Sequence, residues 1–340
     1  MKTRKVLSIL AACVMSAGVL AGCGSSSSST SASTTAATEA AADTASTEAA
    51  ATTASTEAAA DTASTEAAAD TASSTAAPVS GEVTAAGSSA LLPLAQAAAE
   101  KFMEANPDCV VTVNGGGSGE GLKQVADGSV DIGDSDVFAE EKLDSDAAAK
   151  LVDHEVCTIT MAPVVNKDLG VTNLNTDQLI SIFTGKTTNW SEVGGPDEDI
   201  LLVTRPSSSG TRALFKTWAL NGEEEASNAS LETDDSGTLL QTVEQNKGAI
   251  GYVALSYLVN DDNVQAVSID GVEPTLENTY SGDYKVWGYE HMYTNGDGSD
   301  AAQAFINYMM GDDFSADLES MGYGVTSKMS DAAVSAHANQ

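Results

Sequence analysis

Residues 110–136 read VVTVNGGGSGEGLKQVADGSVDIGDSD, and this stretch decides the class of fold. A run of β-branched residues predicts a strand at 110–113, which leads into a turn rich in glycine. A helix is expected from this turn to Asp127, where a glycine ends it. The apolar residues at 130–133 predict another strand, followed by the polar run at 134–136. A strand, a helix and a strand in this order indicate an α/β unit with parallel strands.

The same alternation continues on both sides of this stretch. Helical spacing of apolar residues predicts helices, and short runs of β-branched residues predict strands. The expected strands are 83–85, 200–204, 249–253 and one near 286–293. The expected helices are 91–105, 177–184 capped by Thr176, 211–220, 237–246 capped by Ser236, and two near 301–310 and 314–321. The chain is therefore expected to be an α/β protein with a largely parallel sheet.

Three turns between a strand and a helix are rich in Ser, Thr and Gly. They lie at 87–90, 117–119 and 208–211. The first turn of a helix has backbone N–H groups without an intrahelical partner, and with the helix dipole they attract anions. Each turn alone could serve only to cap its helix. Three such turns, with Arg205 and Arg212 beside the last one, favour an anion site.

The overall charge limits the possible ligands. The formal net charge is −34, and only three arginines occur among 340 residues. Such acidity argues against nucleic acid, which needs a basic surface. The three histidines, His154, His291 and His337, lie far apart in the sequence without the spacing of metal ligands. No metal ion or cofactor is therefore expected, and any anion site must be local.

Asp136 is the most informative carboxylate in the sequence. It follows an apolar strand and is expected at the same end of the sheet as the polar turns. A phosphate ion at neutral pH carries a proton, which a carboxylate accepts as a hydrogen bond, whereas sulfate carries none. A carboxylate in the site would therefore favour phosphate over sulfate. Asp131 and Asp134 are lower-ranked alternatives, and Asp136 could also be a helix cap or a solvated turn residue.

The N-terminus has the features of an export signal. Lys2, Arg4 and Lys5 precede a short apolar run, and small residues follow it. This order predicts a signal peptide at 1–22, because the run is short for a membrane-spanning helix. The quartet LAGC at 20–23 resembles a bacterial lipobox, which implies lipid attachment at Cys23.

Residues 23–78 are expected to form a disordered tether behind that anchor. They consist almost entirely of Ala, Ser, Thr, Glu and Asp, and a unit of nine residues such as DTASTEAAA repeats along them. No large apolar residue is present to form a core. Beyond this tether, the sequence leaves open whether Cys109 and Cys157 form a disulfide.

Six stretches, in order along the chain, resemble the substrate-binding lipoproteins of bacterial phosphate ABC importers. They are GSSALLPLAQAAAEKF (87–102), NGGGSGEGLKQVADGSVDIGDSD (114–136), IFTGKTTNWSEVGG (182–195), RPSSSGTRALF (205–215), NKGAIGYVALSYL (246–258) and AAQAFINYMM (301–310). The resemblance runs from about Gly81 to Lys328. It implies a periplasmic-binding-protein-like fold of type II, in which two lobes close on the ligand about a hinge.

The resemblance also implies lobe boundaries and a set of phosphate ligands. The first lobe would comprise 79–161 plus 255–330, the second lobe 162–254, and 331–340 would be a C-terminal tail, with crossings near 160–163 and 253–256. The implied ligands are Ser89, the Ala90 amide, Ser118, Asp136, Arg205, Ser209, the Gly210 amide and Thr211. In some relatives an acidic residue in the arginine loop holds the arginine. Ser207 stands there in this chain, so the position of Arg205 is open. Arg212 could share the anion, bridge the lobes or form a salt bridge.

The expected function is that of an extracytoplasmic receptor, anchored to the cell membrane by lipid. It would capture inorganic phosphate as a monomer and deliver it to the permease of an ABC importer, without covalent chemistry. One alternative is a receptor for another tetrahedral oxyanion, such as sulfate, molybdate or tungstate. Another is a secreted phosphatase or esterase that uses a loop serine, although no histidine stands near these serines in the sequence.

Overall fold

The computed structural model describes residues 79–337. The expected signal peptide, Cys23 and the tether lie outside these residues, as do 338–340. Among the helices of the described part, none has the length and apolar character needed to cross a membrane.

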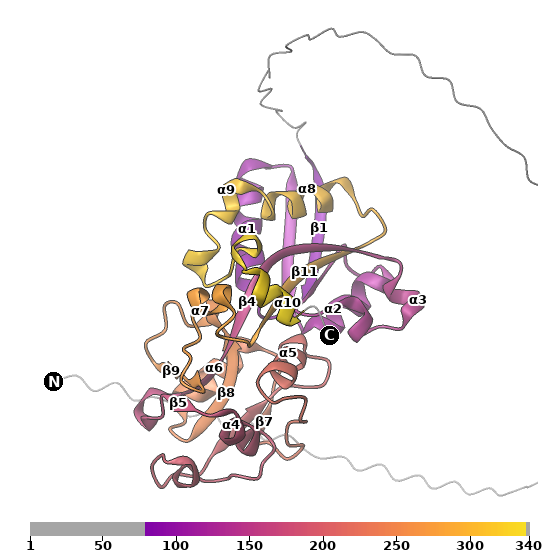
Figure 1. The fold of residues 1–340 in the computed structure, drawn as a ribbon. Helices are drawn as coiled ribbons and strands as arrows, with labels where there is room; N and C mark the ends of the chain where they lie inside the picture. The colour runs from indigo at the N-terminus through magenta and orange to yellow at the C-terminus, as the bar shows by residue number, and fades with distance from the viewer. Residues whose placement is uncertain (1–78, 338–340) are drawn as a thin grey trace, which may run out of the picture. The chain divides into compact units, whose positions relative to one another are not determined.

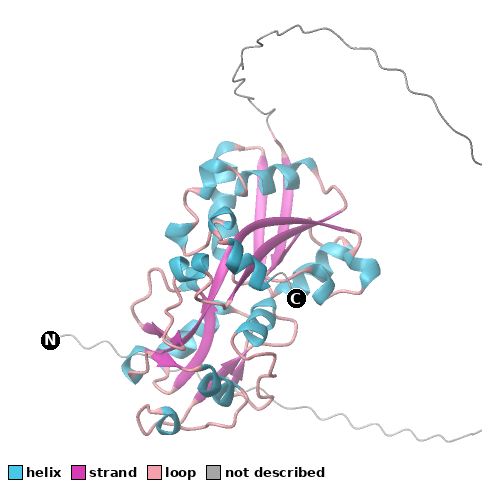
Figure 2. Ribbon diagram, in the orientation of Figure 1, coloured by secondary structure: helices cyan, strands magenta, loops and turns pink. Residues whose placement is uncertain are grey.

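One mixed sheet forms the centre of the described part (Figures 1 and 2). Its strands run in the order β2-β1-β3-β11-β4-β8-β6-β7, and β9 also pairs with β4. Their bounds are β1 Gly81–Gly87, β2 Cys109–Gly115, β3 Ile132–Ser135, β4 Leu151–Asn166, β6 Leu201–Thr204, β7 Leu231–Glu232, β8 Ala249–Ala254, β9 Val264–Ala266 and β11 Trp287–Asn295. A separate pair consists of β5, Asn173–Leu174, and β10, Ser268–Ile269.

The expectation of a largely parallel sheet is only partly correct. The strands β1, β2 and β3 are parallel, and so are β6, β7 and β8. Between these two groups, β11 and β4 run antiparallel to their neighbours. The sequence reading had missed β4, which is buried without a break from Val156 to Asn166. A strand buried on both faces lacks the alternation of apolar and polar residues that marks a strand in a sequence.

The strand β4 connects the two parallel groups. Residues 151–160 pair with β11, and Met161 to Val165 pair with β8. In Figure 1, β4 accordingly extends from the neighbourhood of β11 to that of β8. The resemblance implies that the chain crosses between the lobes near 160–163 and again near 253–256. These two segments lie side by side, because Met161 of β4 pairs with Ala254 of β8. The division into two lobes at these positions stays a prediction.

Helices flank the sheet (Figure 2). Their bounds are α1 Leu92–Ala105, α2 Ser118–Asp127, α3 Ser145–Ala148, α4 Thr176–Phe183, α5 Gly210–Trp218, α6 Ser236–Gln245, α7 Leu276–Ser281, α8 Asp300–Met309, α9 Asp312–Ser315 and α10 Asp331–His337. Short 3-10 helices lie at Ala139–Glu141, Lys167–Leu169, Trp190–Val193, Leu255–Tyr257, Glu319–Met321 and Thr326–Lys328. The expected C-terminal tail thus contains a helix, α10.

Three local expectations were wrong. The cap of α4 is Asn175, whose side chain accepts from the Gln178 amide, and the cap of α6 is Asp235. Both helices therefore begin at the residue that was expected to cap them. The expected helix at 314–321 is broken after Ser315, because its backbone bonds there span three residues, as from Leu318 N to the Ser315 carbonyl.

Aromatic side chains pack beneath the strand ends at β6 and β8. The rings of Phe215 and Tyr252 stack with their centroids 4.0 Å apart, and Phe183 lies 4.9 Å from Phe215. All three rings are fully buried. Their stacking holds helix α5, which contains Arg212 and Phe215, against Tyr252 of β8. Cys109 and Cys157 are both buried and free, so they do not form a disulfide.

Asp134 is an unusual residue in this core. It lies on β3 with no exposed surface, and neither carboxylate oxygen has a hydrogen-bond partner among the described residues. Burial, and after it the charge of Asp136, raises the pKa of Asp134 well above its ordinary value of 3.8. The folded protein therefore keeps Asp134 protonated at pH values at which the unfolded chain would ionise it.

We expect Asp134→Asn to stabilise the protein in a pH-dependent way. A raised pKa contributes stability that is complete below the unfolded pKa and is lost as the pH rises toward the folded pKa. Asn is neutral at every pH, so the variant avoids this loss. Thermal melts should give equal Tm values near pH 4 and a Tm higher by about 5 °C in the variant at pH 8. A difference that stays constant with pH would contradict this account.

Candidate anion-binding site

Each predicted ligand lies just beyond the carboxyl end of a strand. Ser89 and Ala90 follow β1, Ser118 follows β2, and Asp136 follows β3. The remaining ligands, Arg205, Ser209, Gly210 and Thr211, follow β6. All eight residues are buried. Carboxyl ends of strands are where α/β sheets commonly bind ligands.

Asp136 joins polar groups from three of these loops. One of its carboxylate oxygens accepts a hydrogen bond from Ser88 Oγ, and the other accepts from Thr211 Oγ1 at 2.7 Å. Its backbone N donates to Ser118 Oγ at 3.0 Å. A carboxylate with two hydroxyl donors is well placed to remain an acceptor. The structure therefore brings Ser118, Asp136 and Thr211 together as expected from the sequence.

The turn after β1 uses both of its serines. Ser88 Oγ accepts from the backbone N atoms of Ala90 and Leu91, each at 3.0 Å. The Ala90 amide, a predicted ligand, is thus bonded within its own turn. Ser89 Oγ donates to the Asp234 carbonyl at 2.8 Å and lies 2.9 Å from Ser236 Oγ. Sequence reasoning had singled out Ser89 and missed the contact of Ser88 with Asp136.

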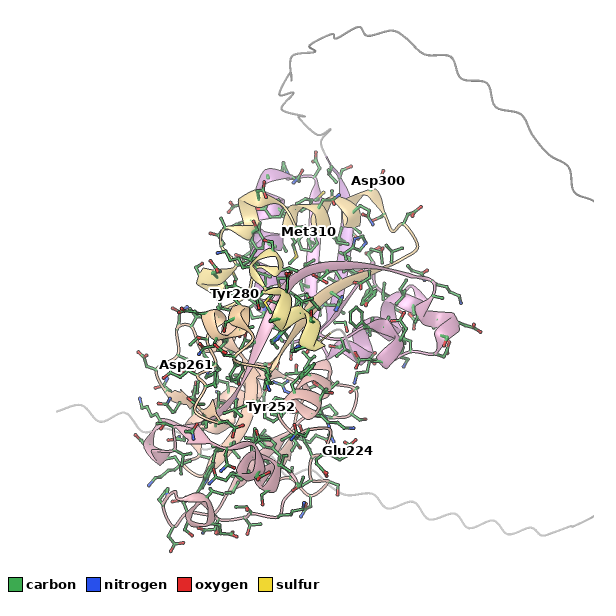
Figure 3. All side chains as sticks on the ribbon, viewed as in Figure 1. Glu224, Tyr252, Asp261, Tyr280, Asp300 and Met310 are labelled. Carbon is green, nitrogen blue, oxygen red and sulfur yellow. The ribbon has the colours of Figure 1, made fainter. Side chains whose placement is uncertain are left out.

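Arg205 is fully buried, and its guanidinium is held from three sides. Nη1 donates to the Asp234 carbonyl at 3.2 Å. Nη2 donates to Ser236 Oγ at 2.9 Å and to the Tyr252 carbonyl at 3.1 Å. The guanidinium carbon also lies 5.4 Å from the centre of the Tyr252 ring, which Figure 3 labels. Nε is buried and has no hydrogen-bond partner in the described part of the chain. Three of the five N–H groups are thus bonded, and the Nε–H is a fixed donor that remains for a ligand.

Asp234 provides the acidic partner that the arginine loop lacks. Its carboxylate lies 3.8 Å from Arg205 Nη1. Burial raises the pKa of Asp234, while the charge of Arg205 acts in the opposite direction. This residue had not been predicted, because it is 29 positions from Arg205 in the sequence. The only sequence signal for Asp234 was that it forms an acidic pair with Asp235, just before helix α6.

Two glycines allow the loops to approach closely. A Cβ atom at Gly117 would lie 1.8 Å from Asp234 Oδ2, and the φ angle of +88° there also favours glycine. A Cβ atom at Gly210 would lie 2.2 Å from Ser118 Oγ. The N-terminus of α5, which Ser209 caps through the Arg212 amide, thereby lies directly against Ser118.

Arg212 serves a different purpose from Arg205. Its Nη1 donates to the Arg205 carbonyl and lies 3.8 Å from Glu225, and its Nη2 lies 3.4 Å from Glu224. Figure 3 labels Glu224. Of the roles left open by the sequence, the structure shows the salt bridge. Glu225 also accepts from the Tyr252 hydroxyl at 2.6 Å, so Arg212 stabilises the scaffold beneath Arg205.

Lys142 is a further cation that sequence reasoning missed. Its Nζ donates to the carbonyls of Ser207 and Ser209, at 3.0 and 3.1 Å. Burial lowers the pKa of Lys142, and the charges of Glu141, Asp136 and Asp234 oppose this change. Lys142 therefore links the segment after β3 to the loop that carries Arg205.

The three histidines of the described part contact groups outside the serine-rich loops. His291 Nδ1 is 2.9 Å from Asp153, and His154 Nε2 is 3.4 Å from Thr294. His337 stacks between Trp218 and Trp287. No hydrogen bond within the described residues joins a histidine to a loop serine, and no group of three potential metal ligands occurs in that part of the chain.

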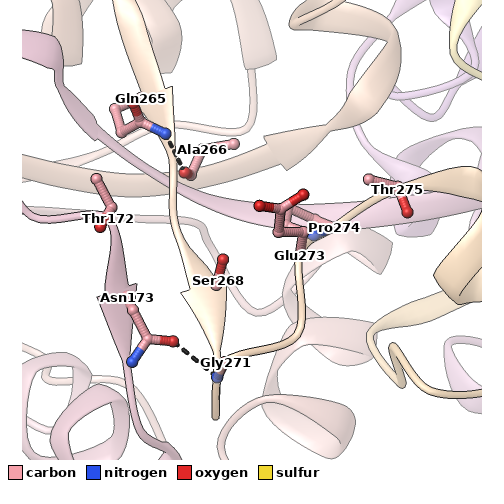
Figure 4. Close-up of a pocket in the computed structure, with 9 residues that line it drawn as sticks. All are labelled: Thr172, Asn173, Gln265, Ala266, Ser268, Gly271, Glu273, Pro274 and Thr275. Atoms are coloured by element: carbon pink, nitrogen blue, oxygen red, sulfur yellow. Dashed lines mark hydrogen bonds between the residues drawn. The ribbon is translucent and has the colours of Figure 1, made fainter.

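A pocket of about 540 Å³ lies elsewhere, beside β5 and β10 (Figure 4). Its wall includes the hydrogen bond from Gly271 N to Asn173 Oδ1, at 2.7 Å. Glu273 is the one charged residue in the lining, and no predicted ligand belongs to it. This pocket therefore provides no cation for an anion.

Comparison with known proteins identifies the family. The family model described as the PBP superfamily domain matches residues 38–313. The phosphate-binding protein PstS of Bacillus subtilis is 52% identical over 227 residues, which cover 67% of this chain and 74% of that protein.

Solved structures give the same result. A putative phosphate ABC transporter substrate-binding protein of Clostridium perfringens, with bound phosphate, has a TM-score of 0.66 and 30% identity, covering 72% of this chain and all of that one (100%). An ABC-type phosphate transport receptor of Vibrio cholerae has a TM-score of 0.57 and 27% identity, covering 72% of this chain and 99% of that one. The chain therefore belongs to the PBP superfamily, in the family of the phosphate-binding protein PstS.

Proposed function

We propose that this protein is an extracytoplasmic receptor that binds inorganic phosphate and delivers it to an ABC importer. The observation that carries the proposal is a buried Arg205 with a free Nε donor. Arg205 and Ser89 both donate to the Asp234 carbonyl, and Ser88, in the same turn as Ser89, donates to Asp136. The names of its relatives in Bacillus, Clostridium and Vibrio support the same ligand.

Arg205 and Asp136 would have complementary roles. The guanidinium provides the charge for a dehydrated oxyanion, and the hydroxyl of Ser118, which accepts from Asp136 N, keeps its hydrogen as a neutral donor. Ser89 and Thr211 would donate to the anion in place of their bonds to the Asp234 carbonyl and to Asp136. The carboxylate of Asp136 accepts the proton that phosphate retains at neutral pH. Sulfate would place an unprotonated oxygen against the same carboxylate. The two buried oxygens would then have no hydrogen between them and could not form a hydrogen bond. Mismatches of this kind can discriminate by about 10⁴-fold or more.

Binding would involve closure of the two predicted lobes, 79–161 plus 255–330 and 162–254. Several hydrogen bonds cross this boundary at the site. Gly119 N donates to the Ser208 carbonyl at 3.0 Å, and Lys142 donates to the same loop. Since these contacts need both sides of the boundary together, they favour the closed form, and a ligand that touches both sides adds to that preference.

The remaining parts of the proposal rest on the sequence. Cys23 would carry the lipid that anchors a monomeric receptor to the outer face of the cell membrane, where it meets its permease. No cofactor and no catalytic step is proposed. A receptor for sulfate, molybdate or tungstate is disfavoured because Asp136 would face an ion without a proton, and an enzyme because the loop serines lack a basic partner.

Asp136→Asn should weaken the preference for phosphate over sulfate by about 100-fold or more, because an amide also donates a hydrogen bond to an unprotonated oxygen. Isothermal titration calorimetry with both anions at pH 7.5 measures this ratio. The matched control is Asp131→Asn, since Asp131 bonds Thr84 outside the site. Sulfate heats with no phosphate heats in the wild type would overturn the function. An unchanged ratio in the Asp136 variant would overturn only the role of Asp136.

Lys142→Met should speed the release of phosphate about tenfold, which corresponds to the loss of about 1.4 kcal/mol from the closed form. The anion preference should stay unchanged, because Lys142 contacts carbonyls of the loop and not the predicted ligands' side chains. Stopped-flow release into a phosphate sensor gives the rate, and Lys142→Arg, which keeps a donor, serves as control. Equal release rates in wild type and Lys142→Met would show that Lys142 does not stabilise closure.

A further inference from the structure

Glu290 on β11 is a fully buried carboxyl beside the site. The antiparallel register pairs His291 with Ser135 on β3, so the residue before His291 lies opposite the residue after Ser135. Glu290 is therefore the cross-strand neighbour of Asp136, on the face of the sheet that also bears Asp134. Glu290 was not among the residues singled out from the sequence.

The surroundings of Glu290 contain no basic group that could pair with it. Neither of its oxygens has a hydrogen-bond partner by distance and angle within residues 79–337, yet Asp136 is near enough that a side-chain hydrogen bond with it contributes to raising the pKa of Glu290. The titratable groups near it are Asp134 on β3, Asp136 just after β3, Cys157 on β4 and Tyr323. Tyr323 donates its hydroxyl to the Ala90 carbonyl, and the Cys157 thiol is kept neutral by burial, which raises its pKa. No charge in this group favours the ionised form of Glu290.

Two neighbouring carboxyls in a buried site cannot both be ionised at low cost, so one retains a proton. Asp136 has two hydroxyl donors that stabilise its charge, whereas Glu290 has none. Burial raises the pKa of Glu290 well above its ordinary value, and the charge of Asp136 raises it further. Glu290 therefore retains the proton, and Asp136 carries the negative charge.

We propose that Glu290 is a positioning residue for anion selection: a neutral carboxylic acid that donates its hydrogen to Asp136 and holds that carboxylate ionised and oriented toward the ligand. This inference rests on the proposed binding of phosphate. Asp136 can accept the proton of phosphate only if it does not already carry one, and Glu290 ensures this by keeping the proton of the pair. Ionised Glu290 would instead add a second negative charge next to the bound anion.

Infrared spectroscopy tests the protonation of Glu290 without any ligand. The difference spectrum between wild type and Glu290→Gln at pH 7 should contain the carbonyl stretch of one protonated carboxylic acid. Only the bands of an ionised carboxylate in that difference would overturn the inference. Glu290→Gln keeps the size of the side chain and a hydrogen-bond donor, so the variant is expected to fold.

Calorimetry then tests the effect on selection. Glu290→Gln should retain the wild-type preference for phosphate over sulfate within about threefold, because the amide still donates to Asp136. Glu290→Met has a similar size but no donor, and should lose about tenfold or more of that preference. Asp134→Asn removes another buried carboxyl of the same face, whose oxygens have no partner, and should leave the preference unchanged.

An equal loss in the Gln and Met variants, or no loss in either, would overturn the donor role. If the Met variant does not fold, the infrared comparison still decides, because it uses Glu290→Gln alone. If the wild type gives no phosphate heats although the protonated-acid band is present, the receptor function fails and the protonation of Glu290 stands. If phosphate binds but the band is absent, only the inference fails.

Discussion

The burial of one guanidinium is the constraint on which the rest of this structure depends. Removing a charge from water costs several kcal/mol unless it is paired and hydrogen-bonded. Arg205 has no exposed surface, and it is held by Asp234, Ser236 and the carbonyl of Tyr252. These partners come from β8 and from the segment that enters α6, so the loop after β6 has a fixed position against both.

The same pairing explains how an acidic protein can bind an anion. The Arg205–Asp234 ion pair leaves Nε of the arginine free, and an oxyanion would provide the second negative partner in a dry environment. Neutral donors from the turns after β1, β2 and β6 add hydrogen bonds without further charge. In the proposed account, the carboxylate of Asp136 and the neutral carboxylic acid of Glu290 together determine which anion fits.

The sequence predicted the parts of the site that have local signals. The turns at 87–90, 117–119 and 208–211 were visible because three turns rich in Ser, Thr and Gly precede helices, with two of the three arginines beside one of them. Asp136 was visible because it ends an apolar strand. Arg205 stood out because arginine is rare in this chain. The strands and helices that were predicted followed from periodicity, which is also a local property.

The rest depends on contacts between residues far apart in the sequence. Asp234, Lys142 and Glu290 reach the site only through the fold, and nothing in their own neighbourhoods distinguishes them from other charged residues. The strand β4 was missed because burial on both faces removes its alternation. The two helix caps lie one residue earlier than expected, because Asn175 and Asp235 are equally good caps. The hydroxyls that were expected to cap, those of Thr176 and Ser236, bond to Asp270 and Arg205 instead.

The most direct test of the central claim is a crystal structure of the protein grown with phosphate. The account predicts a single phosphate ion that contacts Arg205 Nε and the hydroxyls of Ser118 and Thr211, with one of its oxygens at hydrogen-bond distance from the Asp136 carboxylate. A phosphate ion bound elsewhere, with Arg205 and Asp136 still in contact only with protein groups, would contradict it.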